Sequence, residues 1–268
     1  MKAPWRPFAS HHLWSLFSPS VGQEHLHCSM KRGFLKARKK EPEIAALIGR
    51  NSVAQEIGLL AQYGVYEFQR DEQLLVLPDG VSQVASLIYL NQQLPEVQSR
   101  VLQILENYCS APVLKGKEIL HLLRGDEGVP TPVCISQHGY KFNLFVAFDC
   151  VFREPDGTIH ILDFKTGKSS FDKRQAYVYL LAARYLYPSC KTVASFYNLE
   201  SGARSSRITA TSSQLEAVQI ELTQIAQQHW QDLRRYRQHP QNFSTIFPPS
   251  SGYSCRLCMF NSVCNFSQ

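Results

Sequence analysis

Two aspartates and a lysine lie close to a tight turn in the middle of the chain, and their spacing could bring them together for chemistry. The turn is the Pro-Asp-Gly of residues 155–157. Pro sets the first dihedral of a three-residue hairpin loop, and Gly takes its left-handed position. Counting back from the loop along both strands places Asp149 directly opposite Asp163. Lys165 falls on the same face, because side chains alternate along a strand with a period of two.

Two carboxylates this close, on a hairpin that is apolar on both faces, cannot both ionise without a compensating cation. A divalent metal would meet this need, because Mg²⁺ prefers one or two carboxylates with water and phosphate oxygens. The metal would activate water at a phosphate, and Lys165 would orient the nucleophile or balance charge. The alternative is a buried ion pair of Lys165 with Asp163, with one aspartate protonated.

The elements that must position these side chains are the strands 142–152 and 158–165, which we expect inside a sheet. Strands flanked by helices predict a mixed α/β fold. Helices are expected at 41–69, at 81–109 with a new turn at Pro95, and at 171–187. A loop is expected at 114–132, and a second hairpin is expected from 191–199 and 205–210. A last helix should run from Ser213 to Gln238, with Ser213 as its cap and Glu216 in the capping box.

The run from Asp149 to Gly167 resembles the nuclease motif of RecB-like proteins in the PD-(D/E)XK superfamily, which usually reads Asp … Asp-Tyr-Lys-Thr-Gly. Here the second part reads Asp-Phe-Lys-Thr-Gly. The resemblance implies a restriction-endonuclease-like mixed sheet flanked by helices. It also implies Mg²⁺ or Mn²⁺ bound by Asp149, Asp163 and the carbonyl of Phe164, with Lys165 assisting the attacking water.

A second motif follows ten residues after the lysine. Gln175 and Tyr179 match the Gln-x-x-x-Tyr helix of the same family. Residues four apart share one face of a helix. The resemblance implies that this pair lies beside the active site and contacts DNA or supports Lys165. An amide and an aromatic at this spacing are otherwise ordinary packing residues.

The early part of the chain departs from the family pattern. RecB-like nucleases commonly have a metal-binding histidine in a Gly-x-x-x-His motif, whereas Gly49 is followed four residues later by Val53. Gln55 or Glu56 could take the place of the histidine. The departure leaves two alternatives, an active nuclease with another third ligand and a catalytically weakened nucleic-acid-binding subunit that retains the fold.

Three cysteines, Cys255, Cys258 and Cys264, lie in the last fourteen residues. Closely spaced thiolates suit zinc or an iron–sulfur cluster, both of which favour four ligands. The alternative is a group of buried reduced thiols. The other cysteines of the core, at 109, 134, 150 and 190, lie in helix or strand patterns and are expected to pack as small apolar residues.

The cysteine spacing resembles that of AddB-type helicase–nuclease subunits and of CRISPR-associated RecB-like exonucleases. In those proteins one cysteine before the nuclease core completes the set, so the resemblance implies a [4Fe-4S] cluster held by Cys28 with the three C-terminal cysteines. The cluster would join the C-terminal segment to the N-terminal region and take no part in cleavage. His25 or His27 could replace Cys28, particularly around zinc. A zinc-bound scaffold that contacts protein partners is therefore a more distant alternative.

The net charge of +6 is partly clustered, in residues 31–40 and in residues 234–237. Basic clusters suit a polyanion, although a solvated helix face explains most charge runs. No run of apolar residues is long enough to span a membrane. Eight cysteines without a secretory signal indicate a reducing compartment, so a cytoplasmic protein is expected.

These observations predict an Mg²⁺- or Mn²⁺-dependent DNA nuclease. By resemblance it would be an exonuclease on single-stranded DNA or DNA ends, acting in repair, recombination or defence, with a helicase or another repair subunit as a partner. The expected organisation is an N-terminal tail (1–22), a helical N-terminal region (23–130), the nuclease core (131–240) and a cysteine-bearing C-terminal segment (241–268).

Overall fold

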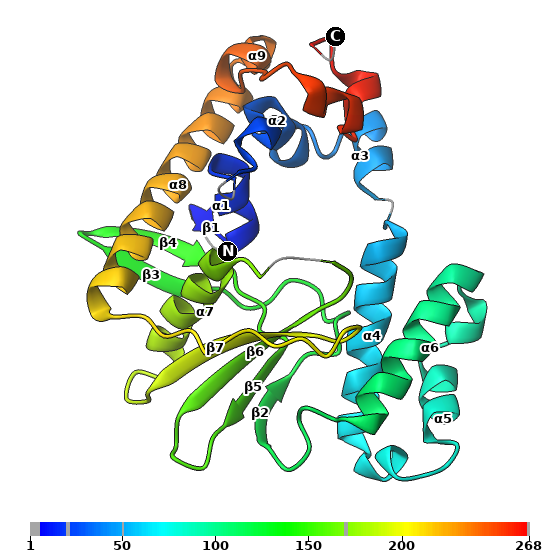
Figure 1. Cartoon of the computed structure of the whole chain (residues 1–268). Coiled ribbons are helices and arrows are strands. Elements are labelled where there is room, and N and C mark those ends of the chain that lie inside the picture. The colour runs from blue at the N-terminus through cyan, green and yellow to red at the C-terminus, as the bar shows by residue number, and fades with distance from the viewer. Residues whose placement is uncertain (1–5, 20–21, 50, 169–170, 267–268) are drawn as a thin grey trace, which may run out of the picture. The chain divides into compact units, whose positions relative to one another are not determined.

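The computed structural model describes residues 6–19, 22–49, 51–168 and 171–266. The chain forms two compact units, each built from separate stretches of sequence. Unit 1 comprises Met1–Arg50, Pro132–Phe145 and Glu216–Gln268. Unit 2 comprises Asn51–Thr131 and Val146–Leu215. The mixed α/β architecture expected from the sequence is confirmed (Figure 1).

The sheet of unit 2 has the order β2-β5-β6-β7. Its strands are β2 (Glu118–Leu122), β5 (Cys150–Arg153), β6 (Ile159–Lys165) and β7 (Thr192–Asn198). The first three run antiparallel, and β7 lies parallel to β6. A parallel pair needs a crossover, and α7 (Lys173–Leu186) provides it. As expected from two apolar faces, β5 and β6 occupy the interior of the sheet.

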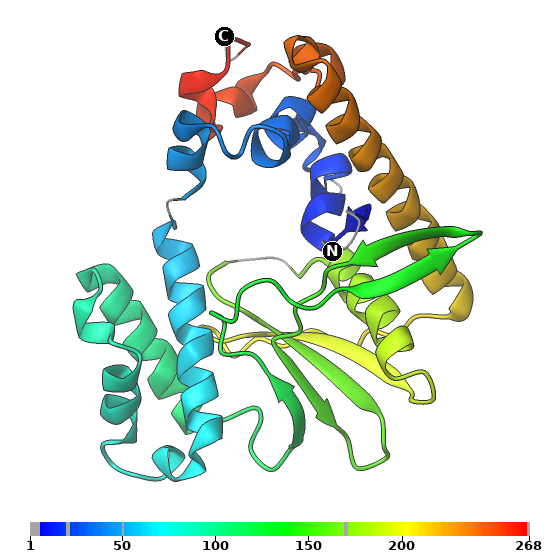
Figure 2. The ribbon, with the colours of Figure 1, turned by 180° about the vertical axis from the view of Figure 1, so that it is seen from behind.

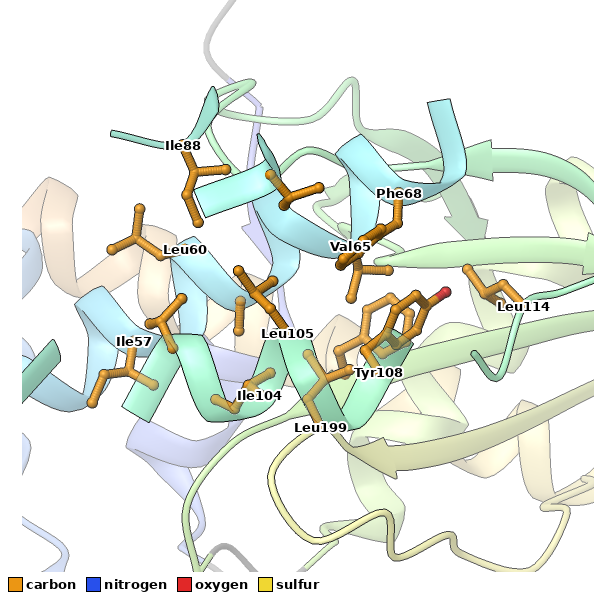
Figure 3. Packing of buried hydrophobic residues seen from close by; sticks show 14 of the residues in the cluster. Ile57, Leu60, Val65, Phe68, Ile88, Ile104, Leu105, Tyr108, Leu114 and Leu199 are labelled. Atoms are coloured by element: carbon orange, nitrogen blue, oxygen red, sulfur yellow. The ribbon is translucent and has the colours of Figure 1, made fainter. Parts of the chain in front are cut away.

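The helices α4 (Val53–Arg70), α5 (Gly80–Leu87) and α6 (Pro95–Ser110) form a cluster beside this sheet (Figures 1 and 2). Short 3₁₀ turns at Glu72–Leu75 and Leu90–Gln92 connect them. Their apolar faces pack together with one face of the sheet in a single core (Figure 3), which includes Ile57, Val65, Phe68, Leu105, Tyr108, Leu162, Phe164 and Leu199. Burial of this apolar surface is the main contribution to the stability of unit 2.

Unit 1 contains a smaller sheet of order β1-β4-β3, with β1 (Phe8–Ala9), β3 (Val133–Gln137) and β4 (Tyr140–Leu144). The β3–β4 hairpin turns at His138 and Gly139, whose φ angles are 47° and 80°. Two left-handed residues match the twist of an antiparallel pair. β1 pairs parallel with β4, so an ordered strand lies within the stretch expected as a tail.

The helices of unit 1 are α1 (His11–Phe17), α2 (Ser29–Lys36), α3 (Pro42–Ile48), most of α8 (Ser212–Gln238), and α9 (Phe243–Ile246). Four 3₁₀ turns lie at Glu24–Leu26, Pro240–Asn242, Tyr253–Leu257 and Asn261–Val263. Arg32 of α2 is buried against α8, where its Nη2 donates to Asp232 at 2.7 Å. None of the helices in the described ranges has the length and apolar character that crossing a bilayer requires.

Several expected elements were wrong in their bounds. The predicted strand 142–152 is two strands, since β4 ends at Leu144 in one sheet and β5 begins at Cys150 in the other. The predicted loop 114–132 contains β2, an edge strand with a register shift that weakens its sequence pattern. The predicted strand 205–210 forms no strand and makes one isolated bridge to β7, at Ile208, while a second bridge lies just before it at Arg204.

The helical pattern of 41–69 is also interrupted, because α3 ends before Gly49 and α4 begins at Val53. The long helix α8 begins one residue earlier than expected. Its capping box is formed by Thr211, which accepts from the Gln214 N–H at 3.2 Å, and by the Gln214 side chain, which accepts from the Thr211 N–H at 2.9 Å. The predicted cap at Ser213 and Glu216 was therefore wrong.

Candidate active site

The Pro-Asp-Gly hairpin has the predicted register. Cys150 pairs with Leu162, and the Glu154 N–H donates to the Thr158 carbonyl at 2.9 Å. Extending this register by one residue places Asp149 opposite Asp163, as predicted. Asp149 lies just before the start of β5.

Asp163 is 2% exposed and lies in a dense polar network. Its Oδ1 accepts hydrogen bonds from the Tyr179 hydroxyl and from Gln175 Nε2, the latter at 2.9 Å. Lys165 Nζ lies 2.5 Å from Asp163 Oδ2 as an ion pair. Oδ2 is buried and accepts no hydrogen bond of regular geometry from any described residue. Oδ1 of this carboxylate is therefore held by α7, and Oδ2 faces the Lys165 ammonium.

Gln175 and Tyr179 of α7 join the lysine to the aspartate. Lys165 Nζ donates to Gln175 Oε1 at 3.0 Å, and Gln175 Nε2 also contacts the Tyr179 hydroxyl oxygen at 2.6 Å. The two side chains are one helical turn apart, so they reach the sheet from the same face of α7. The structure thus brings together both residues of the Gln-x-x-x-Tyr pattern with Asp163 and Lys165.

Asp149 stands next to this network. Its Oδ2 accepts from the Phe164 N–H at 2.7 Å. Although the residue as a whole is only half-buried, its carboxylate points inward, and burial, with the charge of Asp163 second, raises the pKa of Asp149. Hydrogen bonds from Phe164 and Gln62 and the charge of Lys165 oppose this shift. A negative charge on Asp149 is therefore costly in the absence of an added cation.

Burial, together with the charge of Asp163, also raises the pKa of Tyr179 well above its ordinary value. The phenol therefore stays protonated and serves as a donor to Asp163.

The donor set fits a divalent metal ion. Two carboxylates lie on one side of the sheet, Asp163 Oδ2 is engaged by the Lys165 ion pair but by no regular hydrogen bond from a described residue, and all of these donors are oxygens, which Mg²⁺ and Mn²⁺ prefer. The backbone nitrogen of Phe164 is engaged by Asp149. Across the described ranges, no three His, Cys, Asp or Glu side chains are gathered around one point. The protein side chains offered to a metal here are thus the two aspartates.

Helix α4 does not supply its expected ligand to this site. Gln55 closes the capping box of α4 by accepting from the Ser52 N–H at 2.8 Å, and Glu56 accepts from Asn51 at 3.2 Å. No hydrogen bond joins either residue to an aspartate in the described part of the chain. α4 instead contributes Gln62, which hydrogen-bonds Asp149 and donates to the Leu123 carbonyl at 3.3 Å.

The sequence analysis missed Gln62. Its only signal was an amide one helical turn after a small residue, Gly58, and Gly58 lies close to Thr166 in the loop that follows Lys165. A Cβ at Gly58 would lie 3.4 Å from the Thr166 hydroxyl oxygen, in ordinary van der Waals contact.

In unit 1, the four candidate cysteines line one cavity of about 120 Å³. Cys28 precedes α2, Cys255 lies in the 3₁₀ turn Tyr253–Leu257, and Cys258 and Cys264 directly follow the two C-terminal 3₁₀ turns. All four are half-buried thiols outside any disulfide. Burial, with smaller contributions from the other three thiols, raises the pKa of Cys264. Cys28 lines the cavity, whereas neither His25 nor His27 is among its described lining residues.

The remaining cysteines differ from expectation. Cys150 is buried and Cys109 is half-buried, but Cys134 and Cys190 are exposed. The prediction that all four pack as small apolar residues was wrong for these two. Cys134 lies on the short β3 strand and Cys190 follows the end of α7, where few residues cover them.

Comparison with known proteins gives a family match over most of the chain. The model for the PD-(D/E)XK nuclease superfamily matches residues 44–265. No curated protein sequence matches the chain significantly. Among solved structures, "Crystal structure of SSO0001" is similar at 15% identity and a TM-score of 0.30, covering 89% of this chain and 96% of that one.

Proposed function

The chain belongs to the PD-(D/E)XK nuclease superfamily, and on that premise we propose that it hydrolyses DNA phosphodiester bonds with a divalent metal. The observation that carries the proposal is the network of Asp163, Lys165, Gln175 and Tyr179 beside Asp149. Asp149, Asp163 and the Phe164 carbonyl would hold Mg²⁺ or Mn²⁺. A metal ion there would supply Lewis acidity toward the phosphate and lower the pKa of a bound water.

The chain's own residues would prepare this chemistry. Tyr179 and Gln175 fix Asp163 through Oδ1, which leaves Oδ2 available. Gln175 also holds the ammonium of Lys165 at 3.0 Å. Lys165 would orient the attacking water and offset negative charge on the phosphate. Such positioning of charge before the reaction is commonly the largest electrostatic contribution to catalysis.

The finer parts of the proposal rest on the RecB-like motif. Single-stranded DNA or DNA ends as substrate, exonuclease action in repair, recombination or defence, and a helicase or repair partner are carried over from that resemblance. The basic cluster at 31–40 gives partial support. Arg32 is buried with Asp232 and Arg38 pairs with Glu41, so only the lysines of this cluster are offered to a polyanion.

A second candidate function is a nucleic-acid-binding subunit with weakened cleavage. It is favoured by the absence of the early histidine. It is also favoured by Gln55, whose side chain caps α4 and is not placed as a third ligand beside the aspartates. The complete set of Asp, Asp, Lys, Gln and Tyr opposes it. Cleavage of single-stranded DNA with Mn²⁺ separates the two functions.

We further propose that Cys28, Cys255, Cys258 and Cys264 bind a [4Fe-4S] cluster. The four thiols surround a cavity instead of one point, and a cluster that offers one iron to each thiolate needs room between its ligands. The cluster would tie the C-terminal turns to α2. Brown colour with broad visible absorption after anaerobic purification supports this proposal, whereas a colourless zinc-loaded protein would replace it with a zinc scaffold.

Substitution of the lysine tests the nuclease proposal. We expect Lys165→Ala to lower metal-dependent cleavage of single-stranded DNA by about 10²- to 10⁴-fold, because the group that assists the attacking water is lost. DNA binding, measured by fluorescence anisotropy, should stay largely intact. Lys173→Ala, which removes an exposed lysine at the start of α7, serves as the control. Undiminished cleavage by the Lys165→Ala protein contradicts the assignment.

A further inference from the structure

Unit 2 contains a polar cavity of about 210 Å³ on the face of the sheet opposite Asp163. His160 and Asp163 are three residues apart on β6, so their side chains point to opposite faces and lie about 10 Å apart along the strand. The walls come from the β2 edge, the β5–β6 hairpin, β7 and the segment after it. The lining residues with charged or polar side chains are Lys117, Glu154, His160, Ser195, Arg204, Ser205 and Arg207.

The cavity has an excess of positive charge. Lys117 Nζ lies 3.4 Å from Glu154 Oε2, and Arg207 Nη2 donates to Glu154 Oε1 at 2.7 Å. The Arg204 guanidinium lies over the Tyr197 ring at 5.2 Å, and no ion pair joins it to a carboxylate in the described ranges. Three cations thus face one carboxylate, which gives a net formal charge of +2 while His160 is neutral.

Hydrogen bonds hold the single carboxylate in the wall. Glu154 Oε1 contacts His160 Nδ1 at 2.8 Å, and His160 Nε2 contacts the Ser195 hydroxyl at 2.7 Å. A carboxylate can only accept, so the imidazole proton lies on Nδ1, and Nε2 accepts from Ser195. Burial lowers the pKa of His160, which favours this neutral form. Glu154 therefore accepts from three donors, and Arg207 keeps its other N–H groups for a ligand.

We propose that this cavity binds a phosphate monoester, on a free mononucleotide or at the end of a nucleic-acid strand. A phosphate monoester carries a charge close to −2 near neutral pH, which matches the excess of the cavity. Two guanidinium groups offer the forked donors that suit phosphate oxygens. The volume admits a phosphate with its sugar but not a duplex. The inference does not depend on the metal site, because it uses none of the residues proposed to hold the metal or assist cleavage.

Binding measurements on metal-free protein test this inference, since phosphate bound through a metal is then excluded. The probes are inorganic phosphate, 5′-dAMP, and one oligonucleotide that carries either a 5′-phosphate or a 5′-hydroxyl. Binding of each probe is measured by calorimetry at low salt. We expect binding of the phosphorylated probes and about ten-fold weaker binding by Arg204→Gln and by Arg207→Gln, as one charged hydrogen bond is lost in each. Arg153→Gln removes an exposed arginine that pairs with Glu118 outside this cavity, and it should change the affinity less than about two-fold.

The probes also separate the two sources of the phosphate. Binding of 5′-dAMP and inorganic phosphate indicates a free nucleotide, and a preference limited to the 5′-phosphorylated oligonucleotide indicates a strand end. The Arg204→Gln variant breaks no ion pair in the described structure, so a folding defect is not expected to obscure the result. The inference is overturned if no phosphate probe binds at about 10 mM, or if Arg153→Gln weakens binding as much as the two cavity variants.

Discussion

The candidate metal site of unit 2 and the cysteine cavity of unit 1 are both sets of potential ligands, but they are held in different ways. In unit 2, Asp163 is fixed by two donors from α7 and lies on an interior strand. In unit 1, the thiols border a cavity and make sulfur contacts, such as Cys264 Sγ to Met30 Sδ at 3.7 Å and Cys255 Sγ to the Ser250 carbonyl at 3.8 Å. The first set is held by a network of oxygen and nitrogen hydrogen bonds, and the second consists of thiols around a cavity.

The cores behind the two sets differ as well. The metal site is backed by a continuous apolar cluster from α4, α6 and the sheet. The fully buried apolar residues around the thiols are Met30, Phe34, Ile44 and Phe260. A small core rarely stabilises a fold without a metal or a disulfide. We therefore expect unit 2 to keep its site without a ligand, and the region around the thiols of unit 1 to depend on a bound group if the proposed cluster is present.

The largest expected effect is that of a substitution at Asp149, which should abolish most of the cleavage activity without lowering the stability of unit 2. Asp149→Asn should lower metal-dependent cleavage by at least about 10³-fold, because a metal ligand and its charge are lost. The amide oxygen can still accept from the Phe164 N–H. Since the charge of Asp149 is buried beside Asp163, the unfolding free energy of the metal-free variant should be unchanged or higher. Cleavage assays and urea unfolding with a chelator measure both quantities.

A large loss of stability in the metal-free Asp149→Asn protein contradicts this view of unit 2. It would mean that the carboxylate contributes to the fold without a cation. Glu56→Gln provides a control on α4, since the Glu56 side chain accepts a hydrogen bond from Asn51 and from no other residue in the described ranges. Undiminished cleavage by the Glu56→Gln protein would show that the loss in Asp149→Asn is specific to the proposed metal ligand and does not follow from removing any acidic side chain.

The cysteine cavity should behave in the opposite way. Cys264→Ser is expected to destabilise unit 1 by about 3 kcal/mol or more, because binding of a structural metal group contributes directly to folding. Limited proteolysis should cut the chain after residue 247, and visible absorption should fall. The folded fraction should retain metal-dependent cleavage. Cys134→Ser, at an exposed cysteine away from the cavity, is the matched control, and an equal effect of both substitutions excludes a structural role for the bound group.

The sequence predicted the core of the metal site because the relevant signals are local. A Pro-Asp-Gly loop sets the register of its two strands, and Gln175 and Tyr179 are one helical turn apart. The same reasoning could not find Gln62, which approaches Asp149 from α4 through tertiary packing. It also joined β4 to β5, because their apolar patterns are continuous although they belong to different sheets.

Runs of charged residues in the sequence did not predict which cations are buried or which line a cavity. Arg32 belongs to a basic cluster in the sequence, yet it is buried with Asp232 of α8, which lies two hundred residues further along the chain. The cations of the polar cavity in unit 2, at positions 117, 204 and 207, are dispersed in the sequence and form no cluster before the chain folds. Composition therefore located neither the buried arginine nor the charged cavity.

Acid should distinguish the two units through His229 of α8, which is 1% exposed. Arg32 Nη1 lies 3.2 Å from its Nδ1. An arginine only donates, so Nδ1 accepts and the imidazole is neutral. Burial, followed by the charges of Arg32 and Lys36, lowers the pKa of His229 to about 3. Asp232 neutralises Arg32, and the Phe8 ring meets the imidazole in a T-shaped contact with the ring centroids 5.2 Å apart. No carboxylate in the described ranges pairs with His229 to favour its protonated form.

Because the unfolded chain takes up this proton near pH 6.5 and the folded chain does so only near pH 3, stability falls as the pH drops through this interval. At pH 5 the loss from His229 is about 2 kcal/mol. Asp149 acts with the opposite sign, since a raised carboxyl pKa favours the folded state at lower pH.

Hydrogen exchange at pH 7 and pH 5 should therefore show faster opening of α2 and α8 relative to β6. His229→Asn keeps an acceptor for Arg32 but takes up no proton, so it should remove most of this acid sensitivity; an unchanged response would place its origin elsewhere in unit 1.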